Sequence, residues 1–480
     1  MARLNFVPTR SFVGLILFCV ALAVTASAQT FTSLAQLTEA EMDPLYNSLV
    51  QGTDGNFYGT SRDGGTNHTG SVYKVTPDGT VSVFYSFCSL AQCADGFLPY
   101  APLLLAADGN FYGTTGSGGT TNHGTIFKLT SSGTLTTLYS FCPAVGCQDG
   151  ANPSGPLVQG FDGNIYGTAG TIFKVTPGGA FTAMHTFCSL SNCADGNVPL
   201  GLFLARDGTF YGVTQQGGAQ LQGTIFHFTP AGQFKTLYSF CALTDCADGT
   251  FPTGSLVVTA TGTIYGTTEG GGNGNNGTVF ELTPTGTLTT LYKFCGLPCL
   301  DGEAPTSGLI QATDGRLYGS AQAGGHNNRG TAFRVTTAGV FARLHSFDAN
   351  DGAEPLAALV QGTDGSIYGT TAGGGPRNRT VCPEIPPAYG CGTVFRESLA
   401  AKPFVKSVVR AGHVGDSIII LGNNLTGSTS VSFNGTAATF TVVSDTEITA
   451  TVPAGATTGS IQVVTPSSTL ASNLVFRILP

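Results

Sequence analysis

The stretch DGNFYGT, residues 54–60, recurs through the chain in seven recognisable copies. The other copies begin at Asp108, Asp162, Asp207, Thr261, Asp314 and Asp364. Successive starts lie 54, 54, 45, 54, 53 and 50 residues apart. A period near 50 residues is typical of propellers, solenoids or arrays. No reactive side chain is repeated with the motif, so it indicates an architecture rather than a reaction.

Each repeat carries the signals of four short strands, as residues 102–141 show. The apolar run PLLLAA meets a tight turn at Asp108-Gly109, which leads into NFYGTT. A Gly-rich loop then leads to TIFKLT, and Ser132-Gly133 turns the chain into TLTTLYSF. Four strands in about 50 residues predict one propeller blade. A parallel β-helix is less favoured, because its coils are shorter and lack such regular hairpin turns.

The last repeat lacks one strand, and the start of the chain has one strand to spare. The seventh repeat stops at Leu399 without a fourth strand, whereas Phe31–Leu37 matches the LTTLYSF position at the start of the chain. We therefore expect the first strand to complete the last blade, which leaves no open sheet edge. The predicted fold class is all-β, a seven-bladed β-propeller followed by an immunoglobulin-like β-sandwich.

Residues 1–28 have the pattern of a signal peptide. Arg3 and Arg10 are basic, Phe12–Val24 is apolar, and Ala26–Ala28 forms a small-residue cleavage site. The apolar run is shorter than the roughly 20 residues that a membrane-spanning helix needs. We expect a protein that is secreted or held at the cell surface, with no membrane insertion after cleavage.

Twelve of the thirteen cysteines lie beyond this segment and fall into pairs. In an oxidising compartment an even number of paired cysteines predicts local disulfides. The predicted pairs are Cys88/Cys93, Cys142/Cys147, Cys188/Cys193, Cys241/Cys246, Cys295/Cys299 and Cys382/Cys391. Zinc binding is the rival interpretation, but pairs distributed over successive repeats do not converge on one ion. No metal site is therefore predicted from the cysteines.

The composition narrows the class of partner. The chain has 20 Lys and Arg against 28 Asp and Glu, a formal net charge of −8. The absence of a basic stripe argues against nucleic acids and anionic membranes as partners. With 68 Gly, 24 Pro and only 10% charged residues, we expect almost no helix.

The pattern DGNFYGTT…GG…GTIFKLTP…LYSF…DG…P resembles the GloVer tandem repeat of exported bacterial proteins, over about residues 31–398. Two copies depart from it: the third lacks the GG loop, at Gly167–Thr171, and the fifth has Thr261 in place of Asp. The resemblance implies bacterial origin and export. It implies no reaction or cofactor.

Beyond the repeats the composition shifts to Ser, Thr and Val. The segments Gly415–Ser417, Gly422–Asn424, Val431–Gly435 and Val452–Gly455 resemble those of an IPT/TIG domain, an immunoglobulin-like sandwich. Such a domain implies a spacer or contact module. The predicted organisation is a signal peptide at 1–28, a propeller at 29–400 and an IPT/TIG domain at 401–480.

A D-G motif follows the cysteine pairs in successive repeats. Its aspartates and their neighbour are Asp95, Asp149, Asp195, Asp248, Asp301, Asp348 and Asp351. In a four-stranded blade, the loop between the second and third strands and the crossover to the next blade emerge on one face. These carboxylates therefore share that face. We interpret them chiefly as turn residues that bond their own backbone, the alternative being a ligand or calcium site.

Two classes of function remain. The first is an exported binding or surface-structural protein, whose loop face recognises a glycan or an extracellular protein. The second is an extracellular propeller enzyme that acts on polysaccharide through carboxylates in the central channel. The sequence lacks G-x-S-x-G, H-E-x-x-H and Trp, which favours binding over catalysis.

The loops vary more than the strands do, and the seventh Gly-rich loop is the longest. Loops on a rigid scaffold are where recognition residues usually lie. The candidate ligand-binding residues are Arg377, Arg379, Glu384 and Tyr389. The alternative is a loop that has merely lengthened and is held by its own disulfide. No catalytic residue and no cofactor other than calcium is suggested.

Overall fold

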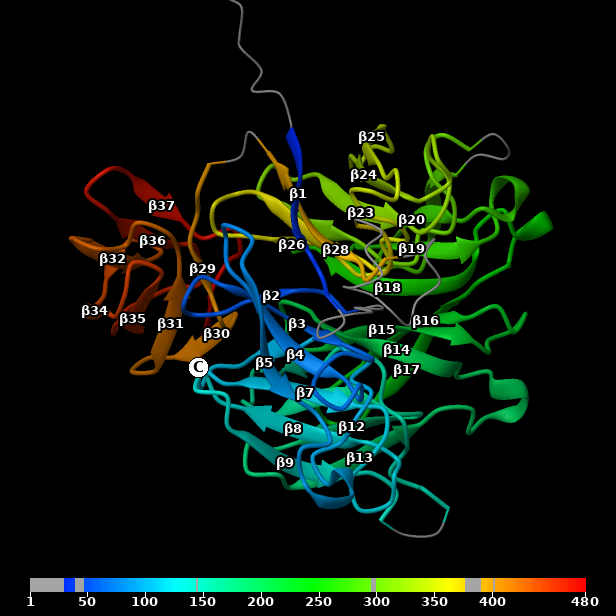
Figure 1. Ribbon diagram of the computed structural model, residues 1–480, viewed down its shortest axis with the longest axis horizontal. Helices are drawn as coiled ribbons and strands as arrows, with labels where there is room; N and C mark the ends of the chain where they lie inside the picture. Colours follow the sequence, from blue (N-terminus) through cyan, green and yellow to red (C-terminus); the bar gives the residue numbers. More distant parts are fainter. Residues whose placement is uncertain (1–29, 39–46, 144–145, 295–298, 376–389, 400–401) are drawn as a thin grey trace, which may run out of the picture.

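The computed structural model describes residues 30–38, 47–143, 146–294, 299–375, 390–399 and 402–480. These residues form seven four-stranded antiparallel sheets, followed by a β-sandwich (Figure 1). The seven sheets are the blades of a propeller. No α-helix occurs in the described ranges, which contain only short 3-10 turns. The turns are η1 (Ala91–Cys93), η2 (Ser191–Cys193), η3 (Thr244–Cys246) and η4 (Asn273–Asn275).

Each blade has four strands, which in six blades follow in sequence order from the centre of the ring outward; in the last blade β1 takes the outermost place. The innermost strands are β2 (Val50–Gln51), β6 (Leu104–Leu105), β10 (Val158–Gln159), β14 (Asn197–Leu204), β18 (Thr250–Val258), β22 (Ile310–Gln311) and β26 (Val360–Gln361). The second strands, which carry the FYGT motif, are β3 (Phe57–Ser61), β7 (Phe111–Thr115), β11 (Ile165–Thr168), β15 (Phe210–Gln216), β19 (Ile264–Gly270), β23 (Leu317–Ala321) and β27 (Ile367–Thr371).

The third strands, which carry the TIFKL motif, are β4 (Ser71–Val75), β8 (Thr125–Leu129), β12 (Thr171–Val175), β16 (Thr224–Phe228), β20 (Thr278–Leu282), β24 (Thr331–Val335) and β28 (Thr393–Ser398). The outer strands are β5 (Val81–Ser86), β9 (Leu135–Ser140), β13 (Phe181–Thr186), β17 (Phe234–Ser239), β21 (Leu288–Lys293), β25 (Phe341–Ser346) and β1 (Thr30–Gln36).

The ring closes as the sequence predicts. Strand β1 pairs antiparallel with β28, so the start of the chain supplies the outer strand of the last blade (Figure 1). Next to the channel, the Gln51 side chain donates to Thr363 Oγ1 (3.1 Å) and accepts from the Thr363 backbone N–H (3.1 Å). The rings of Phe57 and Tyr368 pack at 4.2 Å between the first and last blades.

The repeated motifs are explained by packing within and between blades. A Cβ on Gly113 of the FYGT motif would lie 2.4 Å from the Phe127 ring, so the close approach of second and third strands requires glycine. Asp108 accepts a hydrogen bond from the Tyr112 hydroxyl at 2.9 Å, and four other copies of the motif make the same bond. The buried aromatic side chains form separate cores between neighbouring blades.

The contact between neighbouring blades requires a second glycine, the one that precedes the third strand. Gly223 has φ +99° and precedes β16, and a Cβ there would lie 2.4 Å from Cδ of Pro252 in the next blade. The same contact recurs for Pro99, Pro153, Pro305 and Pro355, each of which packs on a glycine of the preceding blade, whereas Gly170 has no such neighbour.

The C-terminal sandwich has two four-stranded sheets and a parallel pair, β30 with β38. Val431, Phe433, Ile448 and Phe476 are among the buried side chains of its core. Its strands are β29 (Lys406–Ser407), β30 (Ala411–His413), β31 (Ser417–Leu421), β32 (Ser430–Phe433), β33 (Thr436–Ala437), β34 (Phe440–Val442), β35 (Glu447–Thr451), β36 (Ile461–Val464), β37 (Thr469–Ala471) and β38 (Arg477–Leu479).

Candidate functional site

The sandwich covers the face of the ring that carries the tight hairpins, which we call the hairpin face. Thr446 Oγ1 donates to the Thr53 carbonyl (2.8 Å), and Arg477 donates to the Arg206 carbonyl (2.7 Å). Both acceptors lie in the hairpin that joins the first two strands of a blade. The Phe404 N–H donates to the Thr363 carbonyl in the corresponding hairpin of the last blade (3.1 Å). The opposite face, called here the loop face, carries the Gly-rich loops and the crossovers.

Disulfides close four of the crossovers on the loop face. The bonded pairs are Cys88–Cys93, Cys142–Cys147, Cys188–Cys193 and Cys241–Cys246, as the spacing predicts. Cys299 and Cys391 are also disulfide-bonded, whereas their predicted partners, Cys295 and Cys382, lie outside the described residues.

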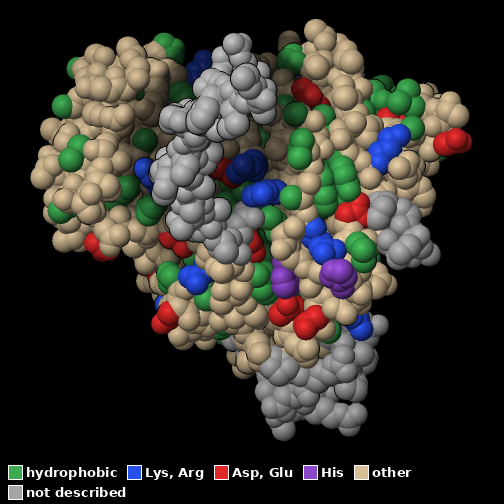
Figure 2. Space-filling view, turned by 90° about the horizontal axis from the view of Figure 1, so that it is seen from above, with side chains coloured by type: hydrophobic (Ala, Val, Ile, Leu, Met, Phe, Trp, Pro, Cys, Tyr) green, Lys and Arg blue, Asp and Glu red, His purple; other side chains and the backbone are tan. Residues whose placement is uncertain are grey.

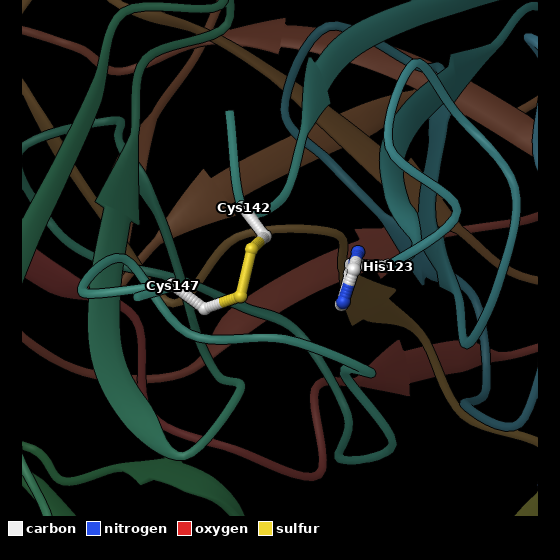
Figure 3. Close-up of side chains that lie close together, drawn as sticks. All are labelled: His123, Cys142 and Cys147. Carbon is white, nitrogen blue, oxygen red and sulfur yellow. A yellow bond between two sulfur atoms is a disulfide. The ribbon is translucent and has the colours of Figure 1, made fainter. Parts of the chain in front are cut away.

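His123 lies beside one of these bonds. One of its ring nitrogens and the sulfurs of Cys142 and Cys147 are within 4.8 Å of one another. Figure 3 shows that the two sulfurs are joined in a disulfide, with the imidazole facing them. Because thiolates are the metal ligands, oxidised sulfurs do not form a metal centre with His123. The imidazole Nδ1 lies 2.6 Å from the Thr121 carbonyl oxygen.

The D-G aspartates organise the crossovers. Asp95 is fully buried and accepts hydrogen bonds from the Tyr85 hydroxyl (2.8 Å) and from the N–H groups of Ser89 (3.0 Å) and Leu90 (3.2 Å). Burial, together with this carboxylate, raises the pKa of Tyr85 to about 12. The aspartate thus bonds a residue ten positions earlier as well as the crossover backbone, which differs from the short-range turn that the sequence suggests.

The same arrangement recurs around the ring. Asp149 and Asp248 accept from Tyr139 and Tyr238 at 2.8 Å each, and Asp301 accepts from Tyr292. His185 and His345 replace the tyrosine beside Asp195 and Asp351, at 3.4 and 2.7 Å. The tyrosines and His345 already occupy carboxylate oxygens that a calcium ion would need, so these contacts support a structural role.

The crossover that lacks a cysteine pair contains Asp348 and Asp351. Asp348 is exposed and accepts from the backbone N–H groups of Asn350 (2.9 Å) and Asp351 (3.1 Å). Asp351 also accepts from the Asp348 N–H at 2.9 Å. The two carboxylates therefore cap their own short turn in place of the disulfide.

The predicted ligand-binding residues of the seventh loop, Arg377, Arg379, Glu384 and Tyr389, lie outside the described residues. They stay a prediction. The structure points to a different set of candidate contact residues, exposed leucines that were not predicted from the sequence.

Three disulfide-closed crossovers expose a leucine at the same position. Leu90, Leu190 and Leu243 are 53%, 58% and 55% exposed. Each precedes the short turn η1, η2 or η3 and follows the cysteine by two residues. The repeated C-x-L spacing in the sequence could have revealed them. They present apolar side chains from a cross-linked backbone on the loop face.

Charged groups form no single-sign area on the side of the molecule drawn in Figure 2, where basic and acidic side chains are few and intermixed. This distribution agrees with the low charge content of the sequence, 10% Asp, Glu, Lys and Arg.

A cavity of about 710 Å³ lies where the central channel meets the sandwich. Inner strands of six blades line it, together with residues 408–413 and 416–418 of the sandwich. Asp416 is the sole carboxylate among the described residues that line it. Glycoside hydrolysis ordinarily needs two carboxyl groups flanking the scissile bond, so this lining does not supply that chemistry.

A family model described as the Gloeobacter/Verrucomicrobia repeat matches residues 20–188 and 168–383. The chain belongs to this repeat family. An IPT/TIG domain model matches residues 403–478, in agreement with the sandwich. No similar protein was found among curated sequences.

Solved propellers resemble the chain at low sequence identity. Extracellular domains of two hybrid two-component systems from B. thetaiotaomicron match it at 11% and 10% identity, with TM-scores of 0.50 and 0.48. The alignments cover 92% and 95% of this chain but only 54% and 60% of those domains. A gluconolactonase of Xanthomonas campestris matches at 12% identity over 79% of this chain and 93% of its own, with a TM-score of 0.39. These likenesses concern the fold.

Two observations bear on location. Disulfides form and persist in oxidising compartments, so the four bonds indicate an extracytoplasmic protein. Within the described part of the chain, no helix is long and apolar enough to cross a membrane. The predicted signal peptide, residues 1–28, lies outside that part.

Proposed function

We propose that the protein is a secreted or surface-held binding protein whose loop face recognises an extracellular protein or glycan. The observation that carries the proposal is the position of the sandwich. It contacts the hairpin face through Thr53, Arg206 and Thr363, and so leaves the loop face turned outward as a recognition surface.

The composition of the loop face supports a protein partner more than a glycan. Leu90, Leu190 and Leu243 are more than half exposed on crossovers fixed by disulfides. Apolar groups held on a rigid surface lose little conformational entropy when a partner covers them. In this scheme the blades are scaffold, the crossovers make contact, and the sandwich is a spacer on the far side.

The experiment compares the native protein with a variant in which the three leucines are replaced by serine. Both are screened on a glycan array and on an array of extracellular proteins. We expect the native protein to bind a protein ligand and the triple variant to lose most of that affinity. A matched control replaces Val414 and Val443, which are 52% and 55% exposed on the sandwich, by serine.

Three outcomes are informative. Equal binding by the native protein and the triple variant would place the site elsewhere. Loss of binding in the sandwich control would assign recognition to the sandwich. For the seventh loop, replacing Arg377 and Arg379 by Ala tests the sequence prediction, with unchanged affinity excluding those two residues.

A further inference from the structure

The cavity between the ring and the sandwich has features that loop-face recognition does not use. Its volume, about 710 Å³, is in the range of ligand pockets. Most of its lining is aliphatic, from the inner strands β6, β10, β14, β18, β22 and β26 and from Val408, Val409 and Ile418. Neighbouring blades are hydrogen-bonded to each other in this lining: the Leu309 N–H donates to the Ser255 carbonyl at 3.0 Å.

Arg410 supplies a positive charge to this apolar cavity. Arg410 lines the cavity while remaining exposed to solvent, and the positive charge of Arg206 lies nearby. Its guanidinium makes a long donation of 3.4 Å to the Leu204 carbonyl. A guanidinium has five N–H donors, so this bond leaves donors that a ligand in the cavity can use.

No carboxylate in the described ranges forms an ion pair with Arg410. Asp416 is the carboxylate in the lining, and it accepts the His413 N–H (2.7 Å) while lying 3.5 Å from His413 Nδ1. A guanidinium that lines an apolar cavity and has no carboxylate partner there favours an anionic ligand, because it can form charge-assisted hydrogen bonds with the anion.

We propose that the cavity binds an amphiphilic anion. Its carboxylate or similar head group pairs with Arg410, and its apolar chain lies along the Leu and Val side chains of the inner strands. The proposal is independent of the loop face, because the cavity lies at the sandwich end of the channel.

Dodecanoate is the probe, and its binding to the full chain is measured by isothermal titration calorimetry, with displacement of anilinonaphthalene sulfonate as a second readout. We expect Arg410→Gln to weaken dodecanoate binding roughly tenfold or more, since a charge-assisted hydrogen bond is lost. Arg410→Lys keeps the charge and should stay within a few-fold of the native protein. Arg343→Gln, on an outer strand far from the cavity lining, should bind like the native protein.

Thermal melting of each variant separates binding from folding. The proposal is overturned if dodecanoate does not bind the native protein below millimolar concentration, or if Arg410→Gln binds as well as the native protein. It is also overturned if Arg410→Lys loses as much as Arg410→Gln at an unchanged melting temperature. Equal binding of dodecyltrimethylammonium would overturn it as well, because a cation of the same chain length should be rejected.

Discussion

Glu397 places a buried carboxyl group among apolar side chains, and replacing it by an apolar residue should stabilise the ring. It lies on β28 at the position where other third strands carry an apolar residue such as Leu129 or Val175. It is 2% exposed and pairs across the sheet with Phe31 and Ile367. Its Oε2 has no hydrogen-bond partner among the described residues.

The magnitude of the effect follows from this environment. A buried polar group without a partner costs about 1–3 kcal/mol, and a leucine at the same position would add apolar contacts instead. We therefore expect Glu397→Leu to raise the free energy of unfolding by about 1–3 kcal/mol. Because the entropy of unfolding grows with chain length, this gain corresponds to a rise in Tm of only about 1–4 °C for a ring of this size.

The gain should depend on pH. Burial raises the pKa of Glu397 above its ordinary value, while His345 and Arg334 oppose the shift. The folded protein therefore holds the proton more tightly than the unfolded chain. Stability is lost as pH rises from the ordinary pKa of a glutamate through the raised one. Glu397→Leu should remove this loss, so its advantage over the native protein is larger at neutral pH than at pH 4.

Differential scanning calorimetry at several pH values provides the measurement. The matched control is Glu281→Leu, since Glu281 lies half-buried in the equivalent strand β20 opposite Tyr265 and should give no comparable gain. A lower Tm for Glu397→Leu at neutral pH would refute the reasoning. So would an advantage that does not change with pH, because then the charge of Glu397 is not what destabilises the ring.

Three further predictions test the packing. Gly223→Ala should lower the free energy of unfolding by about 2–3 kcal/mol or more, because it adds a clash with the next blade to a φ of +99°. The control Gly232→Ala has a φ of +87° but open space around it, and should cost only about 1–2 kcal/mol. Equal losses of stability in thermal melts would contradict the inter-blade explanation. His185→Tyr should stabilise the protein, because His185 Nε2 lies 3.4 Å from Asp195 with no hydrogen-bond partner among the described residues. Burial lowers the His185 pKa against the pull of Asp195, so stability is lost as pH falls through the ordinary histidine value, and the tyrosine variant should lack that loss. Deleting Thr30–Leu37 should expose the edge of β28 and produce aggregation or a large fall in Tm; a deletion variant as stable as the native protein would exclude the closing role of β1.

The blades and their closure are predictable from the sequence because their signals are local. The D-G turns, the apolar alternation and the paired cysteines each depend on a few neighbouring residues, and seven copies make them unmistakable. The seventh repeat has only three strands, and Phe31–Leu37 is a strand without a blade of its own. Pairing the two completes the last blade, and β1 and β28 form this pair in the structure.

The hydrogen bonds of the crossover aspartates are harder to predict from the sequence. The bond between Tyr85 and Asp95 joins residues ten positions apart, beyond the range of turn rules. A signal nevertheless exists, because tyrosine or histidine recurs at a fixed distance before the aspartate in most repeats. Aligning the repeats would also have shown Glu397 in an otherwise apolar column. Arg410 has no such signal, since its surroundings depend on how the two parts of the chain pack.

The packing of the sandwich on the ring has a consequence for the closure itself. Thr446 bonds the first blade at Thr53, whereas the Phe404 N–H bonds the last blade at Thr363. Thr363 is also the partner of Gln51 across the junction between those blades. The junction is therefore held at three levels: by β1 at the outer edge, by the Gln51–Thr363 pair beside the channel, and by the sandwich across the hairpin face. The chain continues from β1 in the last blade to β2 in the first, so the ring can open only where β1 meets β28 through hydrogen bonds alone. If β1 separates from β28, the Gln51–Thr363 pair and the sandwich still hold the first blade against the rest of the last blade, so the sandwich stabilises the propeller at its non-covalent seam.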